Sequence, residues 1–202
     1  MAWIQVSALS SSRSISFYSL PLCVLMASHQ SLIFTYGTLK KGFANHRVMQ
    51  DLIGSNDAVY LGRYSTERSF PLVCGPYGIP FLVNLPGQGH RVSGELYAVS
   101  PRGLSRVDDL EGTSVGYYER STIRVHRLEQ SDAEENRSGG GSGLVIAAEA
   151  YFAHRSYGED LWRRIGRVGL SEYADTRKYV KRADRPKGWT FIEGIRTFAS
   201  SN

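Results

Sequence analysis

The sequence is poor in cysteine and has no long apolar run, and each of these absences excludes certain classes of protein. Two cysteines, Cys23 and Cys74, occur among 202 residues. This number excludes a disulfide-rich secreted scaffold and a zinc site built from cysteines. No apolar stretch reaches the roughly 18 residues that a membrane-spanning helix needs. The five histidines show no metal-ligand spacing, so we expect no metal site.

The chain does contain enough apolar material for one well-packed domain. Hydrophobic residues make up 42% of it and charged residues 21%, which is too apolar for a disordered chain. A length of 202 residues suits one domain, or two at most. The 21 glycines favour turns and close backbone approaches over long bundled helices.

Residues 1–30 differ in composition from the rest of the chain. They hold eight serines, one arginine and no acidic residue. We expect a disordered extension outside the fold of a cytoplasmic protein. Serine-rich, acid-poor segments are also typical of plastid or mitochondrial transit peptides, and residues 15–27 resemble a short secretory segment, so targeting stays open.

The positive net charge of +5 is local. Residues 154–189 carry ten Lys or Arg against five Asp or Glu, and the rest of the chain carries fourteen of each. Aromatic residues such as Trp162 and Tyr179 lie in this segment, but no nucleic-acid motif accompanies them. We expect a solvated basic face and no nucleic-acid partner, with an anionic partner as the alternative.

Hydrophobic periodicity predicts many strands and few helices. The residues between Ser100, a predicted N-cap followed by proline, and Gly112 are expected to form a helix. The polar, Gly- and Ser-rich residues 129–143 are expected to form a flexible loop. A second helix is predicted at 45–53, with Asn45 as cap, and a third around either 159–168 or 171–182. The predicted strands cover 32–37, 57–64, 70–74, 79–85, 91–99, 117–128 and 144–153. Strands interrupted by one helix predict an α+β fold around a small barrel or curled sheet.

Two short elements carry candidate chemistry. In the first, a strand ends in Tyr36-Gly37-Thr38-Leu39, where the turning backbone exposes successive N–H groups that can bind a carboxylate or another oxyanion. We expect Gly37 to be its most sensitive position, because such a turn needs a positive φ or a close ligand approach.

The second element is the helix end Asp108-Asp109-Leu110-Glu111-Gly112. The helix dipole disfavours a carboxylate at this end, and partial burial would act in the same direction, so both raise the pKa of Glu111. A carboxylate with a raised pKa suits general-base catalysis near neutral pH. The plainer alternative is an exposed acid at an acidic helix end.

A third pattern, Gly112 to Gly116, matches the G-x-S-x-G signature of a hydrolase nucleophile. That chemistry needs a strand before the serine and a helix after it. Here the predicted order is reversed, so we do not assign Ser114 as a nucleophile.

In register, several segments resemble the gamma-glutamylcyclotransferase-like superfamily, and within it the gamma-glutamylamine cyclotransferase branch is the most similar. The segments are FTYGTLKKGFANHRVM, FPLV, IPFLVNLPG, VSGELYAVS, VDDLEG and YYERSTIRV, which span about residues 31–128. The resemblance implies a small mixed β-barrel flanked by helices. It places the family domain at 31–155 and leaves a basic C-terminal extension at 156–202.

The resemblance also implies an activity, the cyclisation of a γ-glutamyl group to 5-oxoproline with release of an amine or amino acid. Glu111 corresponds to the catalytic proton acceptor, and Tyr36, Gly37, Thr38 and Leu39 correspond to the substrate-binding loop. Tyr118 and Arg120 match a Tyr-x-Arg element, for which we expect a pocket-wall and supporting role, with strand packing and a salt bridge as the structural alternatives. No cofactor is implied.

Two other functions remain open at this point. One is a member of the same fold that binds a small acidic metabolite without catalysis, because fold does not settle function. The other is a nucleic-acid or membrane-surface role for the basic C-terminal segment. An intact Glu111 favours the enzyme, since a pocket that only binds anions gains nothing from a carboxylate.

Overall fold

The computed structural model describes residues 30–128, 144–174, 179–186, 188 and 190–200. The segment 1–29 and the loop predicted at 129–143 lie outside these residues. The strands in the described part are β1 (Ser31–Thr35), β2 (Ala58–Thr66), β3 (Leu72–Cys74), β4 (Pro80–Leu82), β5 (Ser93–Val99), β6 (Tyr118–Arg127) and β7 (Val145–Ala153). The α-helices are α2 (His46–Gly54), α3 (Pro101–Glu111), α4 (Gly158–Arg164) and α5 (Phe191–Ser200).

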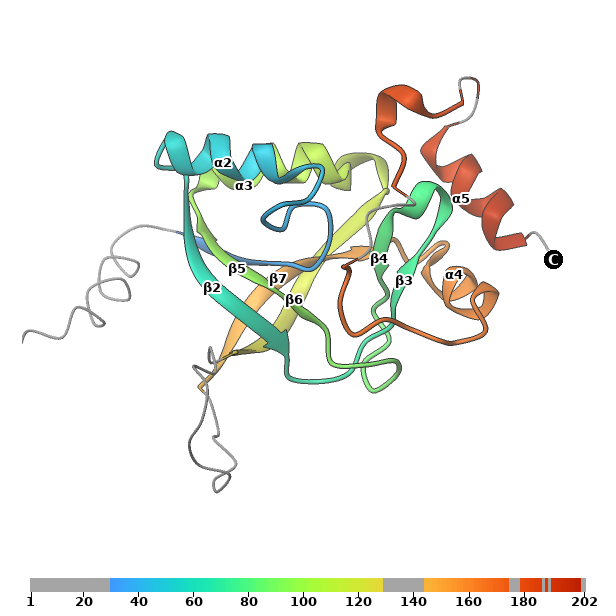
Figure 1. Cartoon of the computed structure of the whole chain (residues 1–202), viewed down its shortest axis with the longest axis horizontal. Coiled ribbons are helices and arrows are strands. Elements are labelled where there is room, and N and C mark those ends of the chain that lie inside the picture. Colours follow the sequence, from blue (N-terminus) through green and yellow to red (C-terminus); the bar gives the residue numbers. More distant parts are fainter. Residues whose placement is uncertain (1–29, 129–143, 175–178, 187, 189, 201–202) are drawn as a thin grey trace, which may run out of the picture.

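Five of the strands close into a barrel in the order β1-β5-β2-β6-β7, with β1 pairing back onto β7 (Figure 1). The closing pair is parallel and the other barrel pairs are antiparallel. Strand β4 also pairs in parallel with β7, and β3 pairs with β4. Helices α2 and α3 lie across one side of the barrel, whereas α4 and α5 lie near β3 and β4. The predicted fold, a small mixed barrel flanked by helices, is confirmed.

Strand β1 contributes buried side chains to both of its faces, which explains why it reads as a continuous apolar run. Successive side chains of a strand point to opposite faces. Ile33 belongs to a cluster with Met49 of α2 and Val107 of α3, whereas Phe34 belongs to a second cluster with Leu96 and other barrel residues. The helices therefore cover one face of the sheet while the barrel closes over the other.

Local sequence signals fix the ends of α3, the helix that carries Glu111. The Ser100 hydroxyl accepts a hydrogen bond from the Gly103 N–H at 3.1 Å, as expected of an N-cap. Gly112 ends the helix in the left-handed region with φ 63°. Asn45 occupies the N-cap position of α2, as predicted, but its side chain makes no capping bond there, and its amide donates instead to the Thr38 hydroxyl at 3.0 Å.

The C-terminal segment forms one of the two helices predicted as alternatives. The helix around 159–168 forms as α4, whereas 171–174 and 179–181 are not helical. Tertiary hydrogen bonds hold these residues instead, since the Tyr173 hydroxyl donates to the Gly78 carbonyl at 3.0 Å and the Val180 N–H donates to the Tyr77 carbonyl at 2.9 Å.

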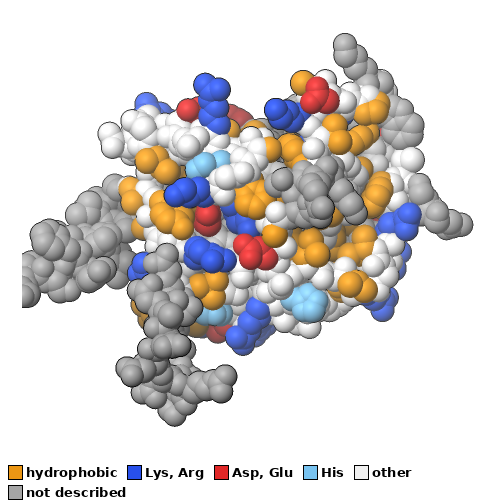
Figure 2. Space-filling view, in the orientation of Figure 1, with side chains coloured by type: hydrophobic (Ala, Val, Ile, Leu, Met, Phe, Trp, Pro, Cys, Tyr) orange, Lys and Arg blue, Asp and Glu red, His pale blue; other side chains and the backbone are white. Residues whose placement is uncertain are grey.

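Acidic and basic side chains are interspersed on the face shown in Figure 2. None of the helices in the described residues is long and apolar enough to cross a membrane.

Candidate active site

Strands β1 and β4 both pair in parallel with β7, at different points along its length, and the candidate site lies between these two pairings. Ile33 of β1 pairs with Glu149, and Leu82 of β4 pairs with Phe152 three residues further on. The chain of β1 leaves the barrel between these two pairings. Two adjoining cavities occur here, one of about 40 Å³ and one of about 780 Å³, and they share the lining residues Thr38, Ile79, Glu111 and Tyr118.

The loop that follows β1 reaches the smaller cavity with three of its four predicted residues. Tyr36, Gly37 and Thr38 line this cavity together with Glu111. Leu39 does not line it, because its side chain is buried in the core cluster under the helices. The structure thus brings Glu111 to the loop, although about seventy residues of sequence separate them.

The loop backbone is ordered by its carbonyls and leaves amides available. The Gly37 carbonyl accepts from the Lys40 N–H at 3.1 Å, and the Thr38 carbonyl accepts from the Asn45 N–H at 2.9 Å. Within the described part of the chain, the N–H groups of Gly37, Thr38 and Leu39 donate to no protein acceptor. Successive free amides of this kind can bind an anion or a polarised carbonyl oxygen.

Gly37 does not adopt a positive φ, contrary to one of the two reasons expected for a glycine here. The requirement is steric. A Cβ on Gly37 would lie 2.6 Å from the Pro80 Cγ, which is closer than real Cβ contacts come. The glycine lets the loop pass directly over the start of β4.

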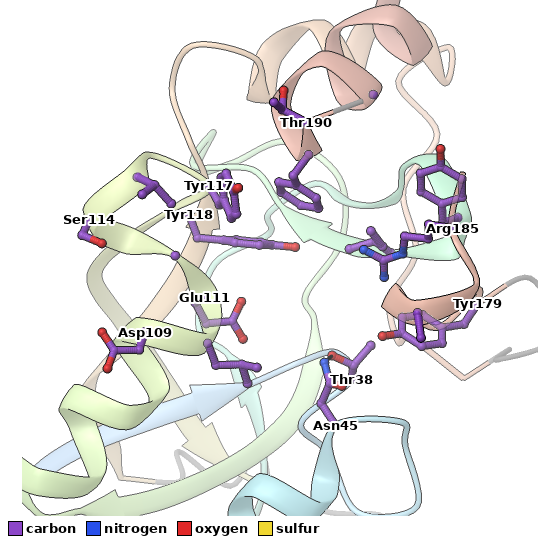
Figure 3. Close-up of a pocket in the computed structure, with 18 of the residues that line it drawn as sticks. Thr38, Asn45, Asp109, Glu111, Ser114, Tyr117, Tyr118, Tyr179, Arg185 and Thr190 are labelled. Carbon is purple, nitrogen blue, oxygen red and sulfur yellow. Dashed lines mark hydrogen bonds between the residues drawn. The ribbon is translucent and has the colours of Figure 1, made fainter. Parts of the chain in front are cut away.

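Glu111 is the last residue of α3, and its side chain faces the cavities (Figure 3). Burial raises its pKa to about 7. Its carboxylate accepts no hydrogen bond from the residues that the structure describes. The neighbouring Asp109 also borders the larger cavity, but it is exposed and its carboxylate points away from Glu111 (Figure 3). The sequence suggests two causes for a raised pKa of Glu111, the helix dipole and burial, and burial is the cause found in the structure.

Four tyrosines surround Glu111. Burial is the main cause that raises the pKa of Tyr36, Tyr118, Tyr151 and Tyr157, and the charge of Glu111 raises each of them further. These hydroxyls stay protonated at neutral pH. Glu111 is consequently the group of this cluster whose charge changes near pH 7.

Tyr118 lines both cavities, as the expectation of a wall residue requires. Its ring stacks on Phe81 with centroids 5.3 Å apart, and its hydroxyl donates to the Pro80 carbonyl at 3.3 Å. The Tyr36 hydroxyl donates to the Tyr151 carbonyl at 2.5 Å. These contacts hold aromatic rings at fixed positions around the carboxylate.

Arg120 lines neither of the two cavities. Its Nε donates to Asp108 Oδ1 at 3.0 Å and its Nη1 to Glu149 Oε1 at 2.6 Å. The Tyr151 hydroxyl donates to the same Asp108 oxygen at 2.7 Å. Because Asp108 lies three residues before Glu111, this network ties the end of α3 to β6 and β7. A supporting role for Arg120 stays a prediction, and it does not form a wall of these cavities.

The sequence reasoning missed the opposite wall of the larger cavity. Residues from the C-terminal segment form it, namely Tyr179, Ala183, Arg185, Pro186, Thr190, Phe191 and Gly194. The aromatic residues among the basic ones are the available signal, but the charge pattern predicts a solvated face for this segment. Among the described residues, no group of three or more His, Cys, Asp or Glu is arranged to hold a metal ion.

Comparison with known proteins identifies the family of this chain. The family described as "Gamma-glutamyl cyclotransferase, AIG2-like" matches residues 33–166. The chain belongs to this family. A protein of Arabidopsis thaliana with the provisional name gamma-glutamylcyclotransferase is 53% identical over 173 residues, which cover 85% of this chain and 92% of that protein.

Two further relatives agree. The gamma-glutamylaminecyclotransferase of Rattus norvegicus is 46% identical over 102 residues, which cover 50% of this chain and 67% of the rat protein. The crystal structure of an AIG2-like protein of Mus musculus matches with a TM-score of 0.63 and 34% identity, covering 78% of this chain and 99% of that one. The family match ends at residue 166, before the C-terminal wall of the larger cavity.

Proposed function

We propose that this family member is a γ-glutamyl cyclotransferase, which converts a γ-glutamyl amide into 5-oxoproline and a free amine or amino acid. One observation carries the proposal: a carboxylate whose pKa is raised to about 7 shares a small cavity with a loop of free backbone amides. The names of the rat and Arabidopsis relatives support the reaction class.

In this reaction Glu111 acts as the general base. Its carboxylate takes a proton from the α-ammonium group of the substrate, and the freed nitrogen attacks the γ-carbonyl carbon. A new C–N bond closes the five-membered ring, and the bond from the γ-carbon to the leaving nitrogen breaks. The protons lost by the attacking nitrogen end on the leaving nitrogen, with Glu111 as carrier. A carboxylate that titrates near pH 7 can both accept and return a proton.

The loop from Tyr36 to Leu39 holds the glutamyl end of the substrate. Free amides at Gly37, Thr38 and Leu39 donate to its carboxylate, or to the oxygen that becomes negative at the γ-carbon. Because ring closure is intramolecular, a loop that fixes the extended glutamyl chain in a bent form supplies a large part of the rate. The reaction uses acid–base groups alone and requires no cofactor.

A purely ligand-binding role is the alternative function. Keeping a partly buried carboxylate without a hydrogen-bond partner costs stability. An anion-binding pocket gains nothing in return, whereas a general base needs this environment. The position of Glu111 therefore favours catalysis over binding alone.

The test is release of 5-oxoproline from a panel of γ-glutamyl substrates by the purified full chain. The panel includes γ-glutamyl amino acids, γ-glutamyl-ε-lysine and γ-glutamyl alkylamides. We expect catalysed release from at least one class. Binding of the panel without any release of 5-oxoproline would support the ligand-binding alternative instead.

A further inference from the structure

The larger cavity contains a cation for which the reaction at Glu111 has no use. Arg185 is the basic side chain among its described lining residues, and it comes from the C-terminal segment. Figure 3 shows Arg185 and Glu111 on opposite sides of the cavity, both directed into it. Because Arg185 lies across the cavity from Glu111, it suggests a ligand group that lies beyond the glutamyl moiety.

Arg185 is positioned but not neutralised. Its Nε donates to the Val180 carbonyl at 3.0 Å, and its guanidinium lies over the rings of Tyr77 and Tyr179 at 5.5 and 5.8 Å. No described carboxylate lies within salt-bridge distance of it. Its other N–H groups donate to none of the described residues, and a guanidinium fork is well matched to a carboxylate.

The surroundings of Arg185 provide a second donor and an apolar surface. The Tyr179 hydroxyl points into the cavity beside Arg185 and has no hydrogen-bond partner among the described residues. The rings of Tyr117 and Phe191, which pack with centroids 4.6 Å apart, line the same cavity. A ligand with a chain of methylene groups that ends in an acid fits these features, with the methylene groups against the rings and the acid at Arg185 and Tyr179.

The direction of the substrate follows from the two cavities. If the glutamyl end lies against the Tyr36–Leu39 loop, the leaving amine lies beyond Glu111 in the larger cavity. We propose that Arg185 binds a carboxylate on the leaving amine, so that the preferred substrates are γ-glutamyl amides of amino acids and not of simple alkylamines. This inference rests on the proposed function and assigns the leaving-group side of the same site.

The experiment compares matched substrates that differ by one carboxylate. γ-Glutamyl derivatives of glycine, β-alanine, γ-aminobutyrate and ε-aminocaproate are each paired with the γ-glutamyl alkylamide that lacks the acid group. For the best chain length we expect kcat/KM for the acid to exceed that for the alkylamide by ~10-fold or more, the scale of a hydrogen-bonded ion pair.

Arg185→Gln is expected to bring this ratio to about one, and Arg185→Lys to keep part of it, because a point charge remains without the fork. Tyr179→Phe removes only one donor and lowers the ratio by a smaller factor. Arg167→Gln removes an exposed cation outside the cavity and serves as the matched control with the wild-type ratio. A wild-type ratio near one, or an equal loss on both substrates in Arg185→Gln, would overturn the inference.

Ligand-induced thermal stabilisation is measured for the same pairs. If no substrate yields 5-oxoproline, the proposed function fails, but stronger stabilisation by the acids that Arg185→Gln abolishes still upholds the carboxylate site. Equal stabilisation by acids and alkylamides rejects that site whether or not turnover occurs.

Discussion

Gly37 lies so close to Pro80 that a Cβ at position 37 would stand 2.6 Å from the proline Cγ. The loop Tyr36–Leu39 and the start of β4 are therefore held against each other at the smaller cavity. We expect Gly37→Val to push them apart and to abolish substrate binding even where the fold survives. Gly54→Val is the matched control, because a Cβ at Gly54 meets no atom within 4 Å. Thr38→Ser keeps the hydroxyl and should cost far less. Wild-type affinity in Gly37→Val, measured by ligand-induced thermal stabilisation, would move the binding site elsewhere.

The pH dependence of turnover should report the titration of Glu111. A general base works in its ionised form, and burial raises the pKa of Glu111 to about 7. We therefore expect kcat/KM to fall about tenfold per pH unit below this value and to level off above it. A rate that stays constant down to pH 5 would show that a carboxylate with an ordinary pKa, or another group, is the base.

Stability should change with pH for the same reason. The folded-state pKa of Glu111 is raised above the unfolded value of 4.5, so between pH 4.5 and 7 the folded chain binds more protons than the unfolded chain. The free energy of unfolding therefore falls as pH rises through this window. Glu111→Gln removes the cost, and we expect it to gain up to about 3 kcal/mol relative to wild type between pH 4.5 and pH 8. Urea denaturation at both pH values measures this, and an unchanged difference would contradict the burial of the charge.

Arg120 is expected to act by positioning. In Arg120→Gln, Asp108 and Glu149 lose a shared cation, and we expect a loss of roughly 1–3 kcal/mol in stability together with a fall in kcat and little change in KM. Arg124 lies on the same strand as Arg120 and forms an ion pair near the surface with Glu67. Arg124→Gln breaks this pair and is therefore the matched control. If Arg120→Gln lowered stability but left kcat at the wild-type value, its role would be structural only.

Local signals explain which elements could be predicted from the sequence. Ser100 and Gly112 mark the ends of α3 through contacts made within a few residues, and both were identified correctly. Asn45 looks like a similar signal, but its side chain binds Thr38 of the loop, so a tertiary contact overrides the local preference. The same holds at 171–174 and 179–181, where tertiary hydrogen bonds to Gly78 and Tyr77 take the place of the alternative helix.

The site itself could be predicted only in part. Glu111 and the Tyr36–Leu39 loop were singled out from the residues and from the family resemblance. Burial raises the pKa of Glu111, and this burial exists only in the folded chain, where the helix end meets Tyr36 of the loop and Tyr118 and Tyr151 of the barrel strands at the smaller cavity. Arg185 reaches the larger cavity through long-range contacts with Tyr77, and no local pattern in a basic segment distinguishes it from its neighbours.

The most direct test of the account is turnover by Glu111→Gln, measured as 5-oxoproline release beside substrate binding. Glutamine keeps the shape of the side chain and cannot accept the proton, so we predict a normal fold, retained binding and a loss in kcat of ~10²–10⁴-fold, the usual contribution of a general base. Asp109→Asn on the same helix, whose carboxylate points away from Glu111, should keep wild-type turnover. Turnover in Glu111→Gln within about threefold of wild type would contradict the central claim that this carboxylate moves the proton.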